Sequence, residues 1–388
     1  MGVFLLCYAS LSALILAFHI ALAAGLVRNG LDEARRRRGT RGEKDLRAEV
    51  IVALRNEQET LPALLASLWA QTRTDTLFLF VDDRSSDATG RILDEFCASV
   101  GPRARVIHNA NEPRELTGKQ AALDLAFDAC RGDVLLFTDG DCVVPPGWVD
   151  GMLACFQEPE VGIVLGRIEL PSTRGFLGAF QAFEQPLLNQ YNLGSVGIGV
   201  PTGCFGNNMA VRAAALRPVG GFRTIGYSVT EDAMLLDAVC RSGAWKARAR
   251  VVDSCAARTV ARRTWAEFVN QHTRWNAGGL FAADFVTRFF YFLVVVIYLT
   301  SSIVFLPLGL LDWRIPALCS TSFVSIGLLG AIGGLYPGKR KIRYFLSFLP
   351  FLVFFGFFYV FVTLRALLER PFEWKGRALR SHAPAGRP

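Results

Sequence analysis

Long apolar runs at both ends of the chain limit what it can fold into more than any other feature of the sequence. Residues 3–27 form the first run, and three more cover about 285–311, 315–335 and 344–364. An apolar helix of about 20 residues is long enough to cross the hydrocarbon core of a bilayer. Hydrophobic residues make up 52% of the 388 residues, which is high for a soluble domain. We therefore expect one N-terminal and about three C-terminal transmembrane helices.

Basic residues around these runs indicate how the chain lies across the membrane. A signal peptide would need positive charge before its apolar stretch, and no basic residue precedes the first run. The basic residues follow it instead, at Arg28, residues 35–38, Arg41 and Lys44. The positive-inside rule then places the middle of the chain in the cytoplasm, and the basic residues 339–343 agree. The positive-inside rule would place the basic C-terminal tail in the cytoplasm too. Three complete crossings would instead place it on the opposite side of the membrane, so the sequence leaves the side of the tail open. We expect a multi-pass protein of a bacterial inner or plasma membrane.

The charge and the cysteines exclude some other classes of protein. The formal net charge of +8 comes with basic residues that flank the apolar runs, so we expect no nucleic-acid partner. The nine Cys form no CxxC pair and show no metal-type spacing with the four His. Scattered cysteines of this kind are typical of reduced residues on the cytosolic side.

Between the apolar ends, strands and helices alternate along the chain. Apolar strand patterns cover 49–54, 76–81, 104–107 and 133–137, and helical patterns cover 61–68 and 119–129. Buried strands that alternate with helices predict an α/β fold with a mostly parallel sheet. Ligands of such folds bind at the carboxyl ends of the strands. Acidic residues follow two of these strands, at Asp82-Asp83 and at Asp139-Gly140-Asp141.

The Asp139-Gly140-Asp141 segment is a candidate metal site. Two carboxylates one residue apart on an extended segment project in a similar direction. Mg²⁺ and Mn²⁺ prefer oxygen ligands of this type and also bind phosphate oxygens, so the pair could hold a metal ion and a diphosphate. The alternative is an ordinary polar turn after a strand.

Asp-x-Asp is one of several polar motifs that occur in a characteristic order. The others are Arg55-Asn56-Glu57, residues 81–87 (VDDRSSD), Thr117-Gly118-Lys119, Thr230-Glu231-Asp232 and Gln271-His272-Thr273-Arg274-Trp275. Together they resemble membrane-bound family 2 inverting glycosyltransferases of the GT-A fold, the branch with the D, D, D, QxxRW pattern that includes ceramide glucosyltransferase-like and polysaccharide synthase-like enzymes. The resemblance covers about residues 48–275.

The resemblance assigns roles to nine residues. It implies a nucleotide-sugar donor, most often a UDP-sugar, and a Mg²⁺ or Mn²⁺ cofactor. Asp139 and Asp141 match the metal and diphosphate site, and Asp232 matches the general base that deprotonates the acceptor hydroxyl. Asp124 departs from the pattern, because Asn is more usual there. The positions that match donor or nucleotide contacts are Glu57, Asp83, Lys119, Gln271, Arg274 and Trp275, and Asp82 stands next to one of them.

Structural alternatives exist for the last two motifs. Thr230 with two following acids is also a good helix start, and residues 265–275 could be an amphipathic helix with Trp anchors at the membrane surface. The aromatic segment 175–191 could pack in a core or touch a lipid acceptor. Cys204 lacks a neighbouring activator and is not expected to be a nucleophile.

Three functions remain open from the sequence. The first is transfer of one or a few sugars to a membrane lipid at the cytoplasmic face. The second is processive polysaccharide synthesis, for which three C-terminal spans are few. The third is a non-catalytic membrane protein with a transferase-like domain. The expected domains are a transmembrane helix (1–27), a basic linker (28–47), a GT-A domain (48–260), an interfacial helix with QxxRW (261–284), a transmembrane region (285–364) and a basic tail (365–388).

Overall fold

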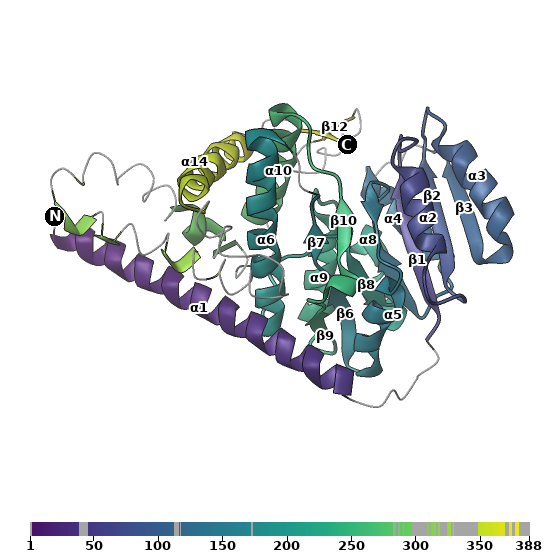
Figure 1. Cartoon of the computed structure of the whole chain (residues 1–388), viewed down its shortest axis with the longest axis horizontal. Coiled ribbons are helices and arrows are strands. Elements are labelled where there is room, and N and C mark those ends of the chain that lie inside the picture. Colours follow the sequence, from purple (N-terminus) through teal and green to yellow (C-terminus); the bar gives the residue numbers. More distant parts are fainter. Residues whose placement is uncertain are drawn as a thin grey trace. The chain divides into compact units, whose positions relative to one another are not determined.

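A computed structural model gives the arrangement of the chain (Figure 1). It describes residues 2–38, 46–111, 116, 118–171 and 174–281, and a discontinuous set between 285 and 379. The chain forms two compact units. We call Met1–Arg28, Ser172–Thr202 and Ala261–Phe372 the helical unit, and Asn29–Pro171, Gly203–Val260 and Glu373–Pro388 the sheet unit.

The sheet unit is built on a seven-stranded sheet in the order β3-β2-β1-β4-β8-β6-β9. The strands β1, β2, β3 and β4 run parallel to one another, and β8 is antiparallel to both β4 and β6. The predicted α/β fold with a mostly parallel sheet is confirmed. The strands are β1 (Ala48–Leu54), β2 (Leu77–Asp83), β3 (Ala104–Asn109), β4 (Val134–Phe137), β6 (Val161–Leu165), β8 (Met209–Arg212) and β9 (Lys246–Ala249).

Alternation of side chains along these strands gives the sheet two buried faces. Val50, Val52 and Phe80 share one core with residues of α2, α3 and α5. The alternate residues point to the opposite face, because successive side chains of a strand do so, and α4 packs against β1 and β2. Each fully buried Val or Phe contributes roughly 1.5–3 kcal/mol. The helices are α2 (Leu61–Trp69), α3 (Thr89–Val100), α4 (Lys119–Ala129), α5 (Trp148–Leu153), α7 (Ala213–Leu216), α8 (Gly221–Ile225) and α9 (Glu231–Arg241).

Smaller sheets complete the strand inventory of the described residues. β5 (Cys142–Val143), β10 (Ala257–Thr259) and β7 (Ile168–Glu169) form a three-stranded sheet in that order, and β11 (Phe372–Trp374) pairs with β12 (Arg377–Leu379). β5 follows the Asp139-Gly140-Asp141 segment directly, so its pairing with β10 anchors the end of that segment.

The helical unit contains α6 (Gly175–Gly197), α10 (Trp265–Leu280) and α14 (Phe348–Leu367). Phe180 and Phe183 of α6, Phe268 of α10, and Phe355 and Phe358 of α14 lie buried in one apolar cluster. Core packing therefore explains these two aromatic residues of the segment 175–191, which was one of the two alternatives.

The N-terminal helix α1 (Gly2–Arg38) is longer than the expected span of residues 1–27. The expected linker is therefore wrong for residues 28–38, which continue the helix, and residues 39–45 lie outside the described part. In the helical unit α1 crosses α6 so closely that a Cβ on Gly25 would come within 2.2 Å of the carbonyl oxygen of Gly194. Only glycine permits this approach.

One helix in the described part of the chain, Leu5–Arg36 within α1, has the length and composition to cross a membrane. A shorter apolar helix covers Phe354–Leu367. Most residues of the predicted spans 285–311 and 315–335, the basic residues 339–343 and most of the tail lie outside the described residues.

Candidate active site

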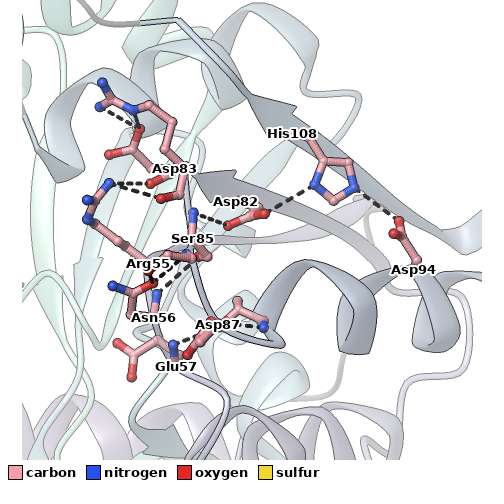
Figure 2. A network of polar contacts seen from close by, with 12 residues as sticks. Arg55, Asn56, Glu57, Asp82, Asp83, Ser85, Asp87, Asp94 and His108 are labelled. Carbon is pink, nitrogen blue, oxygen red and sulfur yellow. Dashed lines mark hydrogen bonds and ion pairs between the residues drawn. The ribbon is translucent and has the colours of Figure 1, made fainter.

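Two loops that follow β1 and β2 are tied together at the carboxyl edge of the main sheet (Figure 2). Arg55 donates to the backbone oxygen of Asp83 at 2.8 Å, and Asn56 accepts from the backbone N–H of Ser86 at 2.9 Å. Asn56 and Arg84 have φ of 51° and 57°, in the left-handed region that non-glycine residues seldom adopt. Strained backbone persists where surrounding contacts hold it, and it often lies at functional sites.

Asp83 is the last residue of β2 and is buried, with 1% of its surface exposed. Its Oδ1 accepts from Asn109 Nδ2 at 2.9 Å and from Arg84 Nε at 2.9 Å. These partners fix the carboxylate at the end of the strand. The sequence predicts the carboxylate but not these partners, because Asn109 ends a strand 26 residues later.

Glu57 lies directly beside the Asp139-Gly140-Asp141 segment. A Cβ added to Gly140 would meet the Cγ of Glu57 at 2.7 Å, so glycine is needed for this close approach. Thr60 donates to Glu57 Oε2 at 2.9 Å, and Thr89 accepts from the Glu57 backbone N–H at 2.8 Å. Residues predicted as nucleotide contacts and metal ligands are thus neighbours in the sheet unit.

The Asp139-Gly140-Asp141 segment is a turn and not the extended strand end that the sequence suggested. The backbone N–H of Cys142 donates to the carbonyl of Asp139 at 3.0 Å, which closes a turn over four residues. Asp141 Oδ1 accepts from Thr259 of β10 at 3.3 Å. The expectation of carboxylates projecting from an extended segment is therefore wrong in its geometry, because Gly140 and Asp141 turn the chain into β5.

Lys119, the first residue of α4, joins two of the predicted motifs. Its Nζ lies 2.5 Å from Asp139 Oδ1 and 3.6 Å from Glu231 Oε1. Burial by itself lowers the pKa of Lys119, but the neighbouring carboxylates Asp139 and Glu231 outweigh it and raise the pKa above its ordinary value. Lys119 is therefore an ammonium at neutral pH. Sequence reasoning overlooked Glu231, although it stands next to the predicted base.

Asp232 lies in the first turn of α9, and both of its oxygens are oriented by backbone groups. Oδ2 accepts from the N–H of Gly206 at 2.7 Å, and Oδ1 accepts from the N–H of Ala233 at 2.9 Å. Each carboxylate oxygen retains lone-pair capacity for another donor, such as a hydroxyl group. Thr230 precedes the helix as its cap residue, but its side chain makes no capping hydrogen bond.

The loop before β8 has one structural residue that the sequence did not separate from its neighbours. Asn208 is completely buried; it accepts from Trp148 Nε1 at 2.8 Å and donates to the carbonyls of Arg167 and Cys255 at 2.7 and 2.8 Å. Burial, with Asp232 nearby, raises the pKa of Cys204 well above its usual value. Cys204 is therefore a thiol and a poor nucleophile at neutral pH, as the sequence predicts.

Asp124, which stands where the family pattern usually has Asn, forms an ion pair. Burial raises the pKa of Asp124, and Arg223, whose Nε lies 2.6 Å from its Oδ2, partly offsets this. The backbone N–H of Arg223 also donates to Asp124 at 3.3 Å. An aspartate is therefore accommodated here because α8 supplies a cation.

Sequence reasoning also missed His108 on β3. Its two ring nitrogens lie 3.2 Å from Asp82 Oδ2 and 3.0 Å from Asp94 Oδ1 (Figure 2). Hydrogen bonding to Asp94, helped by Asp82, raises the pKa of His108 above its ordinary value. Oδ1 of Asp82 accepts from the backbone N–H of Ser85 at 3.2 Å. His108 therefore stabilises, through Asp82, the loop that follows β2.

The residues Gln271, Arg274 and Trp275 all lie on α10, in the helical unit. The helix begins after Thr264, whose side chain accepts from the backbone N–H of Glu267 at 3.2 Å. The ring of Trp275 packs edge-on against His272, with 4.8 Å between ring centroids. The donor contacts expected of these three residues stay a prediction.

The donor atoms suit the metal that the sequence implies. Among the described residues, no three His, Cys, Asp or Glu side chains are grouped as ligands of one ion. Mg²⁺ and Mn²⁺ do not need such a group, because one or two carboxylates complete their coordination with phosphate oxygens and waters. Asp139 and Asp141 supply two carboxylates from one turn, and Lys119 shows that a cation is already held at Asp139.

Comparisons with known proteins identify the family. Residues 134–363 match glycosyl transferase family group 2, and residues 49–217 match glycosyl transferase family 2. An undecaprenyl-phosphate 4-deoxy-4-formamido-L-arabinose transferase of Pseudomonas fluorescens is 34% identical over 31% of this chain and 34% of its own length. A probable glycosyltransferase, YdaM of Bacillus subtilis, is 24% identical over 63% of this chain and 58% of its own length. The chain thus spans about a third of the first relative and somewhat over half of the second.

A solved structure shares the fold. The mannosyltransferase PcManGT from Pyrobaculum calidifontis, in complex with GDP-Man and Mn²⁺, has a TM-score of 0.54 and 18% identity, over 92% of this chain and 99% of that one. The likeness shows that the sheet unit has a fold of the GT-A type, with its mostly parallel sheet. The chain belongs to glycosyl transferase family group 2.

Proposed function

We propose that the chain transfers a sugar from a nucleotide-sugar donor to the hydroxyl group of a membrane lipid, with inversion at the anomeric carbon and at the cytoplasmic face. One observation carries this proposal more than any other. Lys119 Nζ bridges Asp139 of the Asp-x-Asp turn and Glu231, the residue before Asp232. The predicted diphosphate site and the predicted base are therefore neighbours.

The chemistry assigned to these residues is a single displacement. The acceptor oxygen bonds to the anomeric carbon while the bond from that carbon to the donor phosphate oxygen breaks, and the nucleoside diphosphate leaves. Asp232 takes the hydroxyl proton, because a neutral hydroxyl is a weak nucleophile. A single displacement with one base inverts the anomeric configuration.

Developing negative charge on the diphosphate is met by cations. Lys119 is held as an ammonium beside Asp139 and can donate to a phosphate oxygen. Mg²⁺ or Mn²⁺, when bound by Asp139 and Asp141, would supply further positive charge at the same oxygens. Asp83 and Glu57, fixed at the strand ends, fit contacts to the nucleoside, and Arg274 of α10 is the further cation assigned to the diphosphate.

The donor is proposed to be a UDP-sugar, as is common in the family. The structure that shares the fold was solved with GDP-Man and Mn²⁺, which supports a nucleotide-sugar and a divalent ion and leaves the guanosine alternative to the assay.

The lipid acceptor rests on two features. α1 contains a segment long and apolar enough to cross a membrane, and the first relative acts, by its name, on undecaprenyl phosphate. A hydroxyl acceptor is favoured over a phosphate, because a phosphate is already anionic and does not need a base such as Asp232. The boundaries of the GT-A domain (48–260) and of the interfacial helix (261–284) are part of this proposal.

The test is a transfer assay with the purified full chain in lipid nanodiscs. Radiolabelled UDP- and GDP-sugars are supplied with Mn²⁺ and bacterial lipid extract, and the organic phase is separated by thin-layer chromatography. The expected result is one labelled glycolipid that disappears with EDTA and with Asp232→Asn. Glu169→Gln, a partly exposed carboxylate in the same unit, is the control. Label in a high polymer would support the processive synthase instead, and equal transfer by Asp232→Asn would contradict the assigned base.

A further inference from the structure

A buried acid–base pair joins α6 to α10 in the helical unit. His272 Nε2 lies 3.0 Å from Glu184 Oε2, and the two side chains are 1% and 3% exposed. His272 is one of the two variable positions inside the Gln271–Trp275 motif, and no role was assigned to it or to Glu184. Burial of an ionisable group costs free energy of desolvation unless the group is paired. A paired His and Glu buried among aromatic residues therefore suggests a specific role.

Hydrogen bonding fixes the state of the pair. His272 Nδ1 lies 2.9 Å from the backbone oxygen of Phe268, and a carbonyl can only accept, so Nδ1 carries a proton. One further proton lies between Nε2 and Glu184, on one partner or the other. The pair is therefore neutral as a whole, and the ring cannot rotate without losing both hydrogen bonds.

Ring contacts connect this fixed imidazole to Trp275. The His272 ring lies edge-on to Trp275 at 4.8 Å and packs on Phe268 at 4.0 Å and Phe358 at 5.2 Å, between centroids. Residues three apart on a helix lie on neighbouring faces, so the imidazole supports one side of the indole. A change in the position of the His272 ring would therefore alter its packing against Trp275.

A second contact from α6 restrains the start of α10. The Gln181 amide accepts from the backbone N–H of Arg262 at 2.8 Å and donates to its carbonyl at 3.0 Å. Gln181 and Glu184 are three residues apart and lie on one side of α6. α6 therefore contacts α10 at two places, at Arg262 just before the helix and at His272 in the middle of the helix. These two contacts fix the rotation of α10 about its axis.

We infer that Glu184 and His272 are positioning residues that set the orientation of Trp275, and with it Arg274, for the nucleotide-sugar donor. The inference rests on the proposed function, because it takes the donor as the ligand of Trp275 and Arg274. The pair acts by hydrogen-bond geometry and not by proton transfer, since one proton is donated to the Phe268 carbonyl and the other lies between His272 and Glu184.

The test compares four variants of the full chain in nanodiscs, with kcat and KM for the donor and the thermal midpoint measured for each. Glu184→Ala and His272→Ala are expected to lower kcat/KM for the donor about tenfold or more, since small misplacements of binding groups have effects of this size. Glu184→Gln is expected to stay within about threefold of wild type, because its amide N–H can donate to His272 Nε2. Gln185→Leu is the matched control, a buried neighbour on α6 that is expected to change neither constant.

A double-variant comparison separates positioning from a general structural effect. In a Trp275→Ala background, Glu184→Ala is expected to cause little further loss, because its effect passes through Trp275. An equal further loss, a Glu184→Gln variant as impaired as Glu184→Ala, or wild-type kinetics in Glu184→Ala would each overturn the inference. Should Glu184→Ala fail to fold, His272→Asn serves in its place, since it is polar but too short to reach Glu184. Wild-type donor kinetics in Trp275→Ala would instead count against the donor role in the proposed function.

Discussion

Replacement of Lys119 by methionine tests the electrostatic centre of the site. Methionine keeps much of the side-chain volume but removes the ammonium that lies 2.5 Å from Asp139 and 3.6 Å from Glu231. Loss of one partner of a buried ion pair costs about 3–5 kcal/mol. Lys119 is 18% and Asp139 32% exposed, so water screens part of this, and about 2–3 kcal/mol remains.

The measurement is the thermal unfolding midpoint of the purified full chain in detergent. The expected decrease is about 5–10 °C, since 1 kcal/mol corresponds to roughly 2–4 °C in a domain of about 200 residues. Lys246→Met is the matched control, because Lys246 pairs with Glu160 at 3.5 Å on the surface. An exposed pair of this kind is worth about 0–1 kcal/mol.

The pH and metal dependence sharpen this prediction. The folded-state pKa of Lys119 is raised, so its stabilisation is complete below the unfolded value of about 10.4 and is lost only as the pH rises through the folded value. The deficit of Lys119→Met should therefore be constant from pH 6 to 9. Mn²⁺ with a nucleoside diphosphate should reduce the difference in unfolding midpoint between Lys119→Met and wild type, because the metal ion returns positive charge to Asp139. The reasoning is refuted if Lys119→Met and Lys246→Met have the same thermal unfolding midpoint.

Three other substitutions test separate parts of the site. Asp232→Asn should lower transfer by about 10²–10⁴ and destabilise the fold by about 1 kcal/mol in urea unfolding, because the amide oxygen can replace only one of the two acceptors that serve Gly206 and Ala233. Normal turnover would be inconsistent with the assignment. Asn208→Ala should destabilise by about 3 kcal/mol or more, because three buried groups lose their partner, whereas Asn207→Ala should cost less than about 1 kcal/mol; similar urea midpoints would contradict this. His108 has a raised pKa, so its stabilisation is present below about pH 6.5 and lost as the pH rises through the folded value. The unfolding midpoint of His108→Gln should therefore change less between pH 5 and 9 than that of wild type, and identical pH profiles would argue against the role given to His108.

The fold of the sheet unit was predictable because each strand carries its own signal. The apolar run before Asp82 and the helix 119–129 appear where the sequence places them, since continuous apolar runs and 3.6-residue periodicity depend on local sequence alone. The pairing of β4 with the antiparallel β8 was not predictable, because the two strands are separated by about 70 residues and no local pattern states which strand lies beside which.

The carboxylates of the candidate site were also predictable, but their partners were not. Asp139, Asp141 and Asp232 stand out by their position after a strand or at a helix start. The ion pair of Lys119 with Asp139, and that of Arg223 with Asp124, join residues 20 and 99 positions apart. Such contacts depend on how the elements pack, and packing is not encoded in the spacing of any one motif.

The end of α1 shows the opposite error, in which a local signal was misleading. The basic residues 35–38 suggested a linker, yet the structure continues the helix through Arg38. Glu33 pairs with the buried Arg250, and Arg36 donates to Glu158 at 2.8 Å, both within the sheet unit. Arg36 and Glu33 therefore have distant partners that the local sequence does not indicate.

Calorimetric titration of the donor into the purified chain tests the central claim most directly, namely that one site holds the nucleotide-sugar while Asp232 serves only the chemical step. In the presence of Mn²⁺, a UDP- or GDP-sugar should bind Asp232→Asn within about threefold of the wild-type Kd, because a general base is not needed for ground-state binding. Asp139→Asn/Asp141→Asn should lose that binding. Wild-type affinity in the double variant, or loss of affinity in Asp232→Asn, would contradict the account.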